Sequence, residues 1–158
     1  MLLWPFQRVV ATCVALLASD GAGASEVLRG PYRGEVVRVV DGDTVAVRVS
    51  VWLQEEVSVL VRLRGVDAPE LHGRCSDETA RAVAAREALR RALGDGRVVL
   101  SRIEGDKYYG RVLADVATLA GSDAARQLLA GGFARPYAGG KRQPWCGLSA
   151  QPFGEVPG

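Results

Sequence analysis

Valines alternate with other residues on both sides of an Asp-Gly dipeptide, and this pattern constrains the fold more than any other. Residues 34–40 read GEVVRVV and residues 44–50 read TVAVRVS, with Asp41 and Gly42 between them. Alternation at a period of two places one set of side chains on one face of a strand, and Asp-Gly is a favoured pair for a tight hairpin turn. The pattern therefore predicts a β-hairpin with one buried face.

Three more segments carry strand signals. Residues 57–64 (VSVLVRLR) alternate in the same way and place Arg62 and Arg64 on the face opposite the valines. Residues 97–103 (RVVLSRI) and 111–117 (RVLADVA) are rich in aliphatic and β-branched side chains, and a polar connection separates them. Together with the hairpin, these segments predict five short strands.

Two segments have helical spacing. Apolar residues recur every three or four positions over 77–93, which is typical of a helix with one buried face; they are Ala82, Ala85, Leu89 and Leu93. We expect Ser76 or Asp77 to cap this helix at its N-terminus. A second, short helix is expected over 123–130, ended by the glycines that follow it.

The predicted order β-β-β-α-β-β-α favours a mainly β protein built as a five-stranded OB-fold barrel, with a long helix after strand 3 and a short helix after strand 5. A ferredoxin-like layer and an SH3-like barrel are the alternatives, but neither normally places a long helix between strands three and four of five. The chain has 158 residues, which suits one such domain with short additional segments. Its net charge of +2 is too balanced for a polybasic nucleic-acid coat.

Residues 1–24 are typical of a secretory signal peptide. Arg8 precedes an apolar run over 9–18, and small residues at 22 and 24 offer a cleavage site. The run is shorter than the roughly 20 apolar residues that span a bilayer, and a buried N-terminal helix is the alternative. We therefore expect a periplasmic or secreted protein that has no stable membrane association once this segment is removed.

Cysteine usage agrees with export. Removal of residues 1–24 leaves Cys75 and Cys146, and two cysteines in an exported chain of this size suggest one disulfide. In the chain-entropy model, closing a loop of about 70 residues stabilises the folded state by roughly 4 kcal/mol. Free thiols, or a metal pair with the nearby His72, are the alternatives. His72 is the single histidine, which excludes multi-histidine metal sites, and we expect it to be a solvated loop side chain.

Four acidic residues lie close to the ends of predicted strands. Asp41 and Asp43 flank the first hairpin turn, and Asp67 and Glu70 follow the third strand. Strand ends converge at the mouth of a small barrel, where these carboxylates would raise one another's pKa. A hard divalent cation relieves that repulsion, and oxygen ligands in loops suit Ca²⁺. The preference of tight turns for acidic residues explains each acidic pair equally well. The arginines nearby are therefore what favours a functional site over simple turns.

Two arginines are placed to bind an anion beside these acids. Arg62 lies five residues before Asp67 on the polar face of its strand, where it would form a salt bridge or grip a phosphate through two N–H groups. Arg111 opens the fifth strand, and it would be a second phosphate clamp if the loop before it folds toward the same mouth; otherwise it is a surface side chain.

The tail mixes basic and aromatic residues, namely Arg135, Tyr137, Lys141, Arg142 and Trp145. Such a mixture suits a strand of nucleic acid, because rings stack on bases and arginines meet phosphates. We therefore include Tyr137 among the candidate substrate contacts. The alternative is a tail that packs on the barrel and is tied there by the cysteines.

Three blocks together resemble the staphylococcal nuclease (thermonuclease) family. They are DGDT at 41–44, VRLRGVDAPE at 61–70 and DKYYGRVLAD at 106–115, in the order and spacing of that family, and the likeness covers residues 36–137. The resemblance implies an OB-fold nuclease domain over 30–137 that depends on Ca²⁺ and cuts DNA and RNA to 3′-phosphates. The ending GFARPYAGGKRQPWC is similar to secreted bacterial members, which implies an extended tail over 138–158 tied by a Cys75–Cys146 disulfide.

The resemblance also implies a metal-ligand set. Asp43, Asp67 and the main-chain carbonyl of Ala68 would hold Ca²⁺, with Asp41 nearby through water. The family has threonine where this chain has Ala68, but only the carbonyl is needed as a ligand.

Catalytic and substrate contacts carry over in the same way. Glu70 would be the general base or orient the attacking water, while Arg62 and Arg111 would grip the scissile phosphate and stabilise its growing negative charge. Lys107 and Tyr109 would contact another phosphate of the nucleotide. The usual DKYGR is DKYYGR here, so the register of the tyrosine is open between positions 108 and 109.

Two other functions compete with a nuclease. The first is a catalytically inactive OB-fold module that binds single-stranded nucleic acid in the periplasm. The second is a periplasmic domain whose acidic cluster binds Ca²⁺ for stability only. The sequence implies no protein partner, and we expect a monomer.

Overall fold

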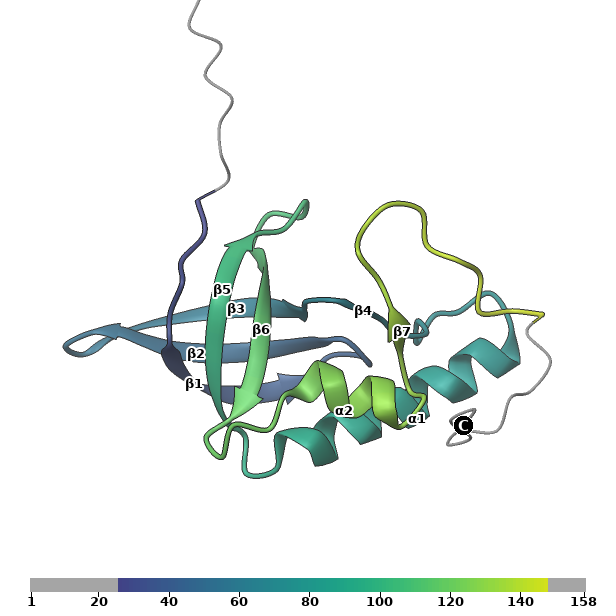
Figure 1. Cartoon of the computed structure of the whole chain (residues 1–158), viewed down its shortest axis with the longest axis horizontal. Helices are drawn as coiled ribbons and strands as arrows, with labels where there is room; N and C mark the ends of the chain where they lie inside the picture. The colour runs from purple at the N-terminus through teal and green to yellow at the C-terminus, as the bar shows by residue number, and fades with distance from the viewer. Residues whose placement is uncertain (1–25, 148–158) are drawn as a thin grey trace, which may run out of the picture.

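The computed structural model of the protein describes residues 26–147. The expected signal peptide and the end of the expected tail, residues 148–158, lie outside the described residues. Five strands form a closed barrel in the order β1-β2-β3-β6-β5 (Figure 1). These strands are β1 (Tyr32–Val39), β2 (Thr44–Trp52), β3 (Glu55–Leu63), β5 (Arg97–Gly105) and β6 (Arg111–Thr118). The predicted OB-fold barrel is confirmed.

The barrel closes through one parallel and four antiparallel strand pairs. β3 and β6 run parallel, while β1–β2, β2–β3, β5–β6 and β1–β5 are antiparallel. The alternating valines explain the closure, because Val45, Val47 and Val61 are fully buried while Arg62 between the buried positions of β3 is not. At about 25 cal/mol per Å² of buried apolar surface, this inward face is the main stabilising contribution of the sheet.

Two helices cover one end of the barrel. The helices are α1 (Ser76–Leu93) and α2 (Ala124–Ala130), and Figure 1 shows them side by side below the strands. α1 contacts α2, β1 and β6 through the predicted stripe of small and aliphatic residues. Ala82, Ala85, Leu89 and Leu93 are all buried. No helix within residues 26–147 is long and apolar enough to cross a bilayer.

The N-cap expected for α1 is wrong by one residue. Cys75, not Ser76 or Asp77, is the N-cap, and it makes no side-chain capping bond. Its sulfur is instead paired with Cys146, and the two Cα atoms lie 6.1 Å apart. The helix therefore starts where the cysteine is held, and the third helical residue, Glu78, accepts hydrogen bonds from the loop before the helix.

The described part of the tail is held against the barrel at Arg142, Trp145 and Cys146, while most of its other residues are exposed. A short strand, β7 (Arg135–Pro136), pairs with β4 (Val66–Asp67), the two-residue strand that follows β3. The chain then folds back to Cys146 without regular structure, and Trp145 is buried. The packed-tail interpretation is therefore the one that the structure supports.

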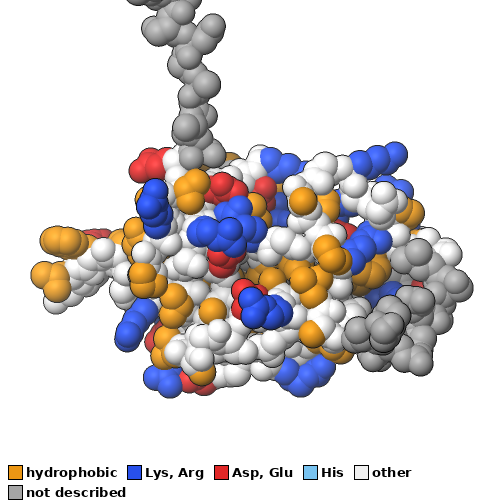
Figure 2. Space-filling model, viewed as in Figure 1, with side chains coloured by type: hydrophobic (Ala, Val, Ile, Leu, Met, Phe, Trp, Pro, Cys, Tyr) orange, Lys and Arg blue, Asp and Glu red, His pale blue; other side chains and the backbone are white. Residues whose placement is uncertain are grey.

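The β2–β3 hairpin projects beyond the barrel. Its tip carries exposed hydrophobic side chains, among them Trp52 and Leu53. Figure 2 shows hydrophobic side chains gathered at one projecting end of the molecule. Val57 is predicted on the apolar face of β3, but it is exposed because no second layer covers the strand at this point of the hairpin.

Gly42 lets the first hairpin turn approach the rest of the molecule. A Cβ at this position would lie 2.7 Å from the Cβ atoms of both Ala68 and Ala85. The turn that carries Asp41 and Asp43 therefore sits against the chain after β4 and against α1. This close packing requires a residue without a side chain at position 42.

We expect Gly42→Ala to destabilise the fold by about 1–3 kcal/mol, because overpacking forces the turn away from its two neighbours. Urea denaturation of the variant measures the loss. Gly105→Ala is the matched control, since a Cβ there meets nothing within 4 Å. Equal stability of the two variants would contradict the packing argument.

Candidate active site

A groove of about 1220 Å³ opens beside the ends of β3 and β6, and charged side chains of both signs line it. The acidic residues of the groove are Asp41, Asp43, Glu70, Glu104 and Asp106. The basic residues are Arg62, Arg64, Lys107, Arg111 and Arg142. The fold therefore brings together residues from all three sequence blocks that resemble the nuclease family.

Asp43 is held between the first hairpin turn and β4. Strand pairing places Thr44 opposite Arg62, which brings the Asp43 carboxylate beside the guanidinium. Arg62 Nη1 lies 2.5 Å from Asp43 Oδ2, and the N–H of Ala68 donates to the same oxygen at 3.2 Å. Thr44 Oγ1 donates to the other carboxylate oxygen at 2.9 Å. Asp43 is only 3% exposed, so this charge is held by a partner rather than by bulk water.

Arg62 is fixed by two contacts. Besides Asp43, it donates through Nη2 to the main-chain carbonyl of Val66 at 3.0 Å. The guanidinium also lies 5.7 Å from the centre of the Tyr137 ring. One arginine thus connects β3, the first turn and β4, and it keeps a face toward the groove.

Asp67 is buried beneath the tail. The β4–β7 pairing sets Arg135 opposite Asp67, and Arg135 donates to Oδ2 through Nε at 3.1 Å and Nη2 at 2.9 Å. The indole N–H of Trp145 donates to the same oxygen at 3.1 Å, and Arg142 Nε donates to Oδ1. Asp67 is 1% exposed, so its predicted place beside the groove is covered by side chains of the tail.

Arg142 also reaches the two positions that follow Asp67. It donates through Nη2 to the carbonyl of Ala68 at 2.9 Å and through Nη1 to the Glu70 carboxylate. Burial lowers the pKa of Arg142, but hydrogen bonds and negative charge from Glu70 and Asp67 outweigh burial and raise it. The Glu70 side chain itself remains 49% exposed at the groove.

Glu78 is a buried acid that sequence reasoning missed. Its carboxylate accepts from the main-chain N–H of Arg74 at 2.9 Å and of Glu70 at 3.5 Å, so it supports the loop that carries Glu70. A glutamate at the third position of a helix, reaching back to the preceding backbone, is the signal that could have indicated this role.

Arg111 lies at the start of β6 and lines the same groove as Glu70. Its Nε is 2.5 Å from Asp106 Oδ2, and its guanidinium lies 4.6 Å from the centre of the Tyr108 ring. Arg62 and Arg111 both line the groove. The predicted pair of arginines therefore shares one cavity, with Arg111 held from the β6 side.

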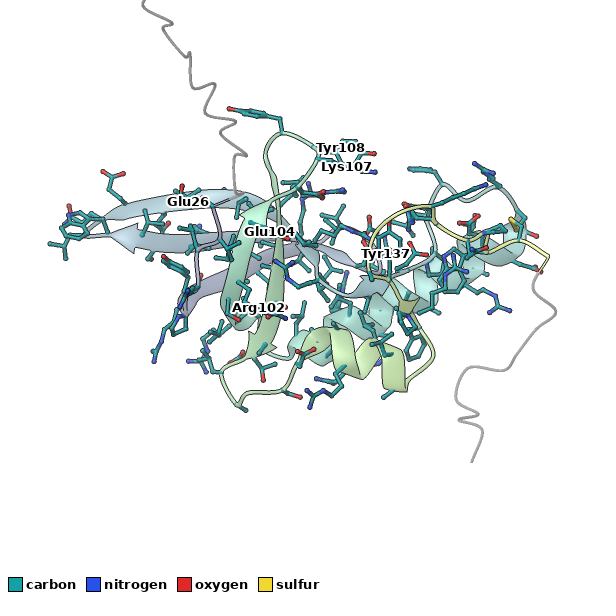
Figure 3. The ribbon with its side chains drawn as sticks, turned by 45° about the horizontal axis from the view of Figure 1, so that its top comes forward. Glu26, Arg102, Glu104, Lys107, Tyr108 and Tyr137 are labelled. Carbon is teal, nitrogen blue, oxygen red and sulfur yellow. A yellow bond between two sulfur atoms is a disulfide. The ribbon has the colours of Figure 1, made fainter. Side chains whose placement is uncertain are left out.

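The structure resolves the register of the two tyrosines. Tyr108 lines the groove with Lys107, whose Nζ lies 5.0 Å from the Tyr108 ring centre, whereas Tyr109 is fully exposed and does not line it. Figure 3 shows Lys107 and Tyr108 at the β5–β6 turn, and Tyr137 at the base of the tail also lines the groove. Tyr108 rather than Tyr109 is thus the ring placed to meet a ligand there.

The remaining predicted residues have simple positions. His72 is exposed on the loop before α1, as expected. Cys75 and Cys146 are paired with each other, with Glu78 beside them, and Cys146 Sγ lies 3.5 Å from Glu78 Oε2. The alternative of a metal pair with His72 has no support among the described residues, because His72 does not belong to that group.

Asp41 carries the clearest sign of excess negative charge. Burial first, and then the charge of Asp43, raise the pKa of Asp41 to about 6; the charge of Glu70 adds to this. Asp41 Oδ1 also accepts the N–H of Asp43 at 3.1 Å, which partly opposes the rise. The three carboxylates are therefore close enough to repel one another.

The donor atoms are oxygens only, which is the chemistry that suits a hard divalent cation. The carboxylates of Asp41, Asp43 and Glu70 line the groove. The Asp67 carboxylate and the Ala68 carbonyl lie behind Arg142, which contacts both. Ca²⁺ and similar ions prefer such oxygens on loops. Burial is the first cause of the raised pKa of Asp41, and the charges of Asp43 and Glu70 add to it. The guanidinium of Arg142 is a cation that already contacts Asp67 and Glu70.

The raised pKa of Asp41 predicts how the free energy of unfolding depends on pH in the absence of divalent cations. Between its unfolded value of 3.8 and about 6, the folded protein binds more protons, so the free energy of unfolding falls as pH rises through this window. Asp41→Asn keeps the acceptor for the Asp43 N–H but removes the charge. We expect the variant to be about 1–2 kcal/mol more stable than the wild type at neutral pH and equal to it near pH 4. Urea denaturation in chelator at both pH values tests this, and a difference that does not change with pH would contradict it.

The closed barrel defines an OB-fold domain with a groove that arginines and carboxylates line together. A family model described as "Staphylococcal nuclease homologue" matches residues 60–145, which is more than half of the 158 residues. The chain belongs to this family. The match includes Arg62, Glu70 and Arg111, while Asp41 and Asp43 precede it and join the site through the fold.

Two curated relatives are similar to parts of the chain. The chain is 43% identical over 63 residues to Micrococcal nuclease of Shigella flexneri, covering 40% of this chain and 30% of that protein. It is 35% identical over 106 residues to Protein ParB of Escherichia coli, covering 65% of this chain and 53% of that protein. The chain thus spans about half or less of the length of these relatives.

Proposed function

We propose that this protein is a Ca²⁺-dependent nuclease that hydrolyses phosphodiester bonds of DNA and RNA and leaves 3′-phosphate products. The observation that carries the proposal is the shared groove of Arg62, Glu70 and Arg111 beside the buried Asp43. Family membership and the similarity to a micrococcal nuclease support the same reaction class.

The two arginines neutralise the substrate. A phosphodiester is already anionic, and attack on phosphorus adds negative charge that guanidinium groups on either side stabilise. Arg62 is held by Asp43 and the Val66 carbonyl, and Arg111 is held by Asp106, so neither has to be ordered when substrate enters. Donors that are already oriented contribute more to the transition state than mobile ones.

Glu70 is the proposed general base, or orients the attacking water. It is the exposed carboxylate of the cluster, so a water molecule and the scissile bond can reach it. Ca²⁺ held by Asp43, Asp67 and the Ala68 carbonyl, with Asp41 nearby, would supply charge neutralisation at the phosphate. Lys107, Tyr108 and Tyr137 line the approach, where ammonium and ring groups suit the flanking nucleotide.

Export is part of the proposal. Residues 1–24 have the sequence pattern of a signal peptide. The pairing of Cys75 with Cys146 suits an oxidising compartment, namely the periplasm or the exterior of the cell. We propose a monomer that acts on nucleic acid without a protein partner.

One observation favours a binding module over an enzyme. Arg142 engages Glu70, Asp67 and the Ala68 carbonyl, and a permanent contact there would block both the base and the cation ligands. Such a protein would hold single-stranded nucleic acid in the groove without cutting it.

Digestion of DNA and RNA with Ca²⁺, and again with excess chelator, separates these functions. Cutting that requires Ca²⁺ and yields 3′-phosphate ends supports the nuclease. Retardation of single-stranded DNA in a gel without cutting supports the binding module. A melting temperature that rises with Ca²⁺, without cutting or retardation, supports a purely structural cation site.

We expect Glu70→Gln to reduce the cutting rate about 10²-fold or more, because a positioned general base typically contributes 10²–10⁴-fold. Its melting temperature should stay close to that of the wild type, since the side chain is half exposed. Glu56→Gln is the matched control, because Glu56 is a similarly exposed acid on the projecting hairpin. Rates of fragment release from a labelled duplex measure both variants, and unchanged cutting by Glu70→Gln would exclude Glu70 as the base.

A further inference from the structure

We propose that Arg142 is a built-in competitor for the divalent cation: its guanidinium occupies the ligand oxygens until the cation displaces it. The inference rests on the proposed function, because it concerns the same carboxylates. It adds that Arg142, which lies on the tail, raises the free cation concentration at which the site is filled.

Arg142 uses the acceptors that the proposed cation needs. Its three nitrogens donate to Asp67 Oδ1, to Glu70 Oε1 and, at 2.9 Å, to the carbonyl of Ala68. A guanidinium and a hard cation take the same oxygen lone pairs, and they repel each other as like charges. The Arg142 guanidinium spans all three acceptors and takes up the space in front of them, so the guanidinium and the cation bind these oxygens in competition.

The partners of Asp67 divide into fixed and exchangeable ones. Arg135 and Trp145 bind Oδ2, whereas Arg142 binds Oδ1. Withdrawal of Arg142 would therefore expose Oδ1 while Asp67 stays anchored through its other oxygen. Arg142 lines the groove, so its side chain can swing into open space without loss of the core.

The segment that carries Arg142 is tied at both ends, and we name residues 137–146 the strap. At one end the N–H of Tyr137 donates to the carbonyl of Gly65 at 2.9 Å, next to the β4–β7 pair. At the other end Cys146 is joined to Cys75. Arg135 also donates to the carbonyls of Gln143 and Pro144 and steadies the strap close to Arg142.

This tethering makes Arg142 an effective competitor. A group held on a short segment with fixed ends acts at a high local concentration, and it does not diffuse away when displaced. Only the state with Arg142 withdrawn can bind Ca²⁺ at these oxygens. When that state is a fraction of the population, the apparent Kd for Ca²⁺ rises by the inverse of that fraction. If the engaged form of Arg142 is about 90% populated, the apparent Kd for Ca²⁺ is about tenfold weaker than the Kd of the free site.

Calorimetric titration of the chelator-treated full-length protein with Ca²⁺ tests the inference. We expect Arg142→Gln to bind Ca²⁺ about tenfold more tightly than the wild type. Lys141→Gln is the matched control: it removes the same charge from the adjacent position of the strap, where Lys141 is exposed, and we expect its Kd to stay within about twofold of the wild type. In chelator, Arg142→Gln should have a lower melting temperature than the wild type. Added Ca²⁺ should raise the melting temperature of the variant by more than it raises that of the wild type.

A second comparison tests the tether. Reduction of the Cys75–Cys146 pair should tighten Ca²⁺ binding by the wild type, because the strap then holds Arg142 less firmly. Reduction should leave the Kd of Arg142→Gln for Ca²⁺ within about twofold of its value in the oxidised variant, since the competitor is already absent. Should Arg142→Gln fail to fold, Arg142→Lys serves instead; it keeps the charge but loses the fork that reaches three acceptors, and tighter Ca²⁺ binding is again expected.

The outcomes separate this inference from the proposed function. Equal or weaker Ca²⁺ binding by Arg142→Gln, in a protein that cuts DNA with Ca²⁺, overturns the competitor and leaves the nuclease intact; Arg142 is then a structural anchor. Absence of Ca²⁺ binding by both proteins at millimolar concentration overturns the cation site and the competitor together. Tighter binding by the variant supports the competitor even where cutting is absent.

Discussion

The ion pair between Asp43 and Arg62 is the interaction on which the rest of the site depends. It joins the first hairpin turn to β3, and the bond from Arg62 to the Val66 carbonyl extends the junction to β4. The N–H of Ala68 completes it by donating to the same carboxylate. A buried carboxylate needs such partners, because an isolated buried charge costs several kcal/mol. The same contacts tie the first turn to the segment that carries Asp67, Ala68 and Glu70, of which Glu70 lines the groove.

The site is built with negative charge in excess and a tail that partly compensates for it. Arg135 and Trp145 satisfy one oxygen of Asp67 from β7 and from the strap, and Arg142 takes the other. This arrangement keeps Asp67 buried without a metal and still leaves Asp41 with a raised pKa. The proposed cation would therefore use oxygens that already accept hydrogen bonds from the tail.

Local patterns predicted the elements well, because each depends on neighbours in the chain. The alternation around Asp41-Gly42 produces a hairpin, and the stripe beginning at Ala82 produces a helix whose stripe is buried. The cap of α1 was missed, because Cys75 is held by a residue 71 positions away. The extra tyrosine was unresolved for a similar reason: only the groove shows that Tyr108 faces inward and Tyr109 outward.

By itself, the sequence determined the order of strands and helices along the chain, the buried valine face and the motifs that carry the acids and arginines, since these follow from short-range periodicity and motif spacing. The tertiary structure alone decided what those acids bind. Asp67 meets Arg135 and Arg142 across 68 and 75 residues of chain, through a two-residue strand pair and a folded-back tail. No local pattern encodes such contacts, because they arise only when the barrel has closed and the tail has packed against it.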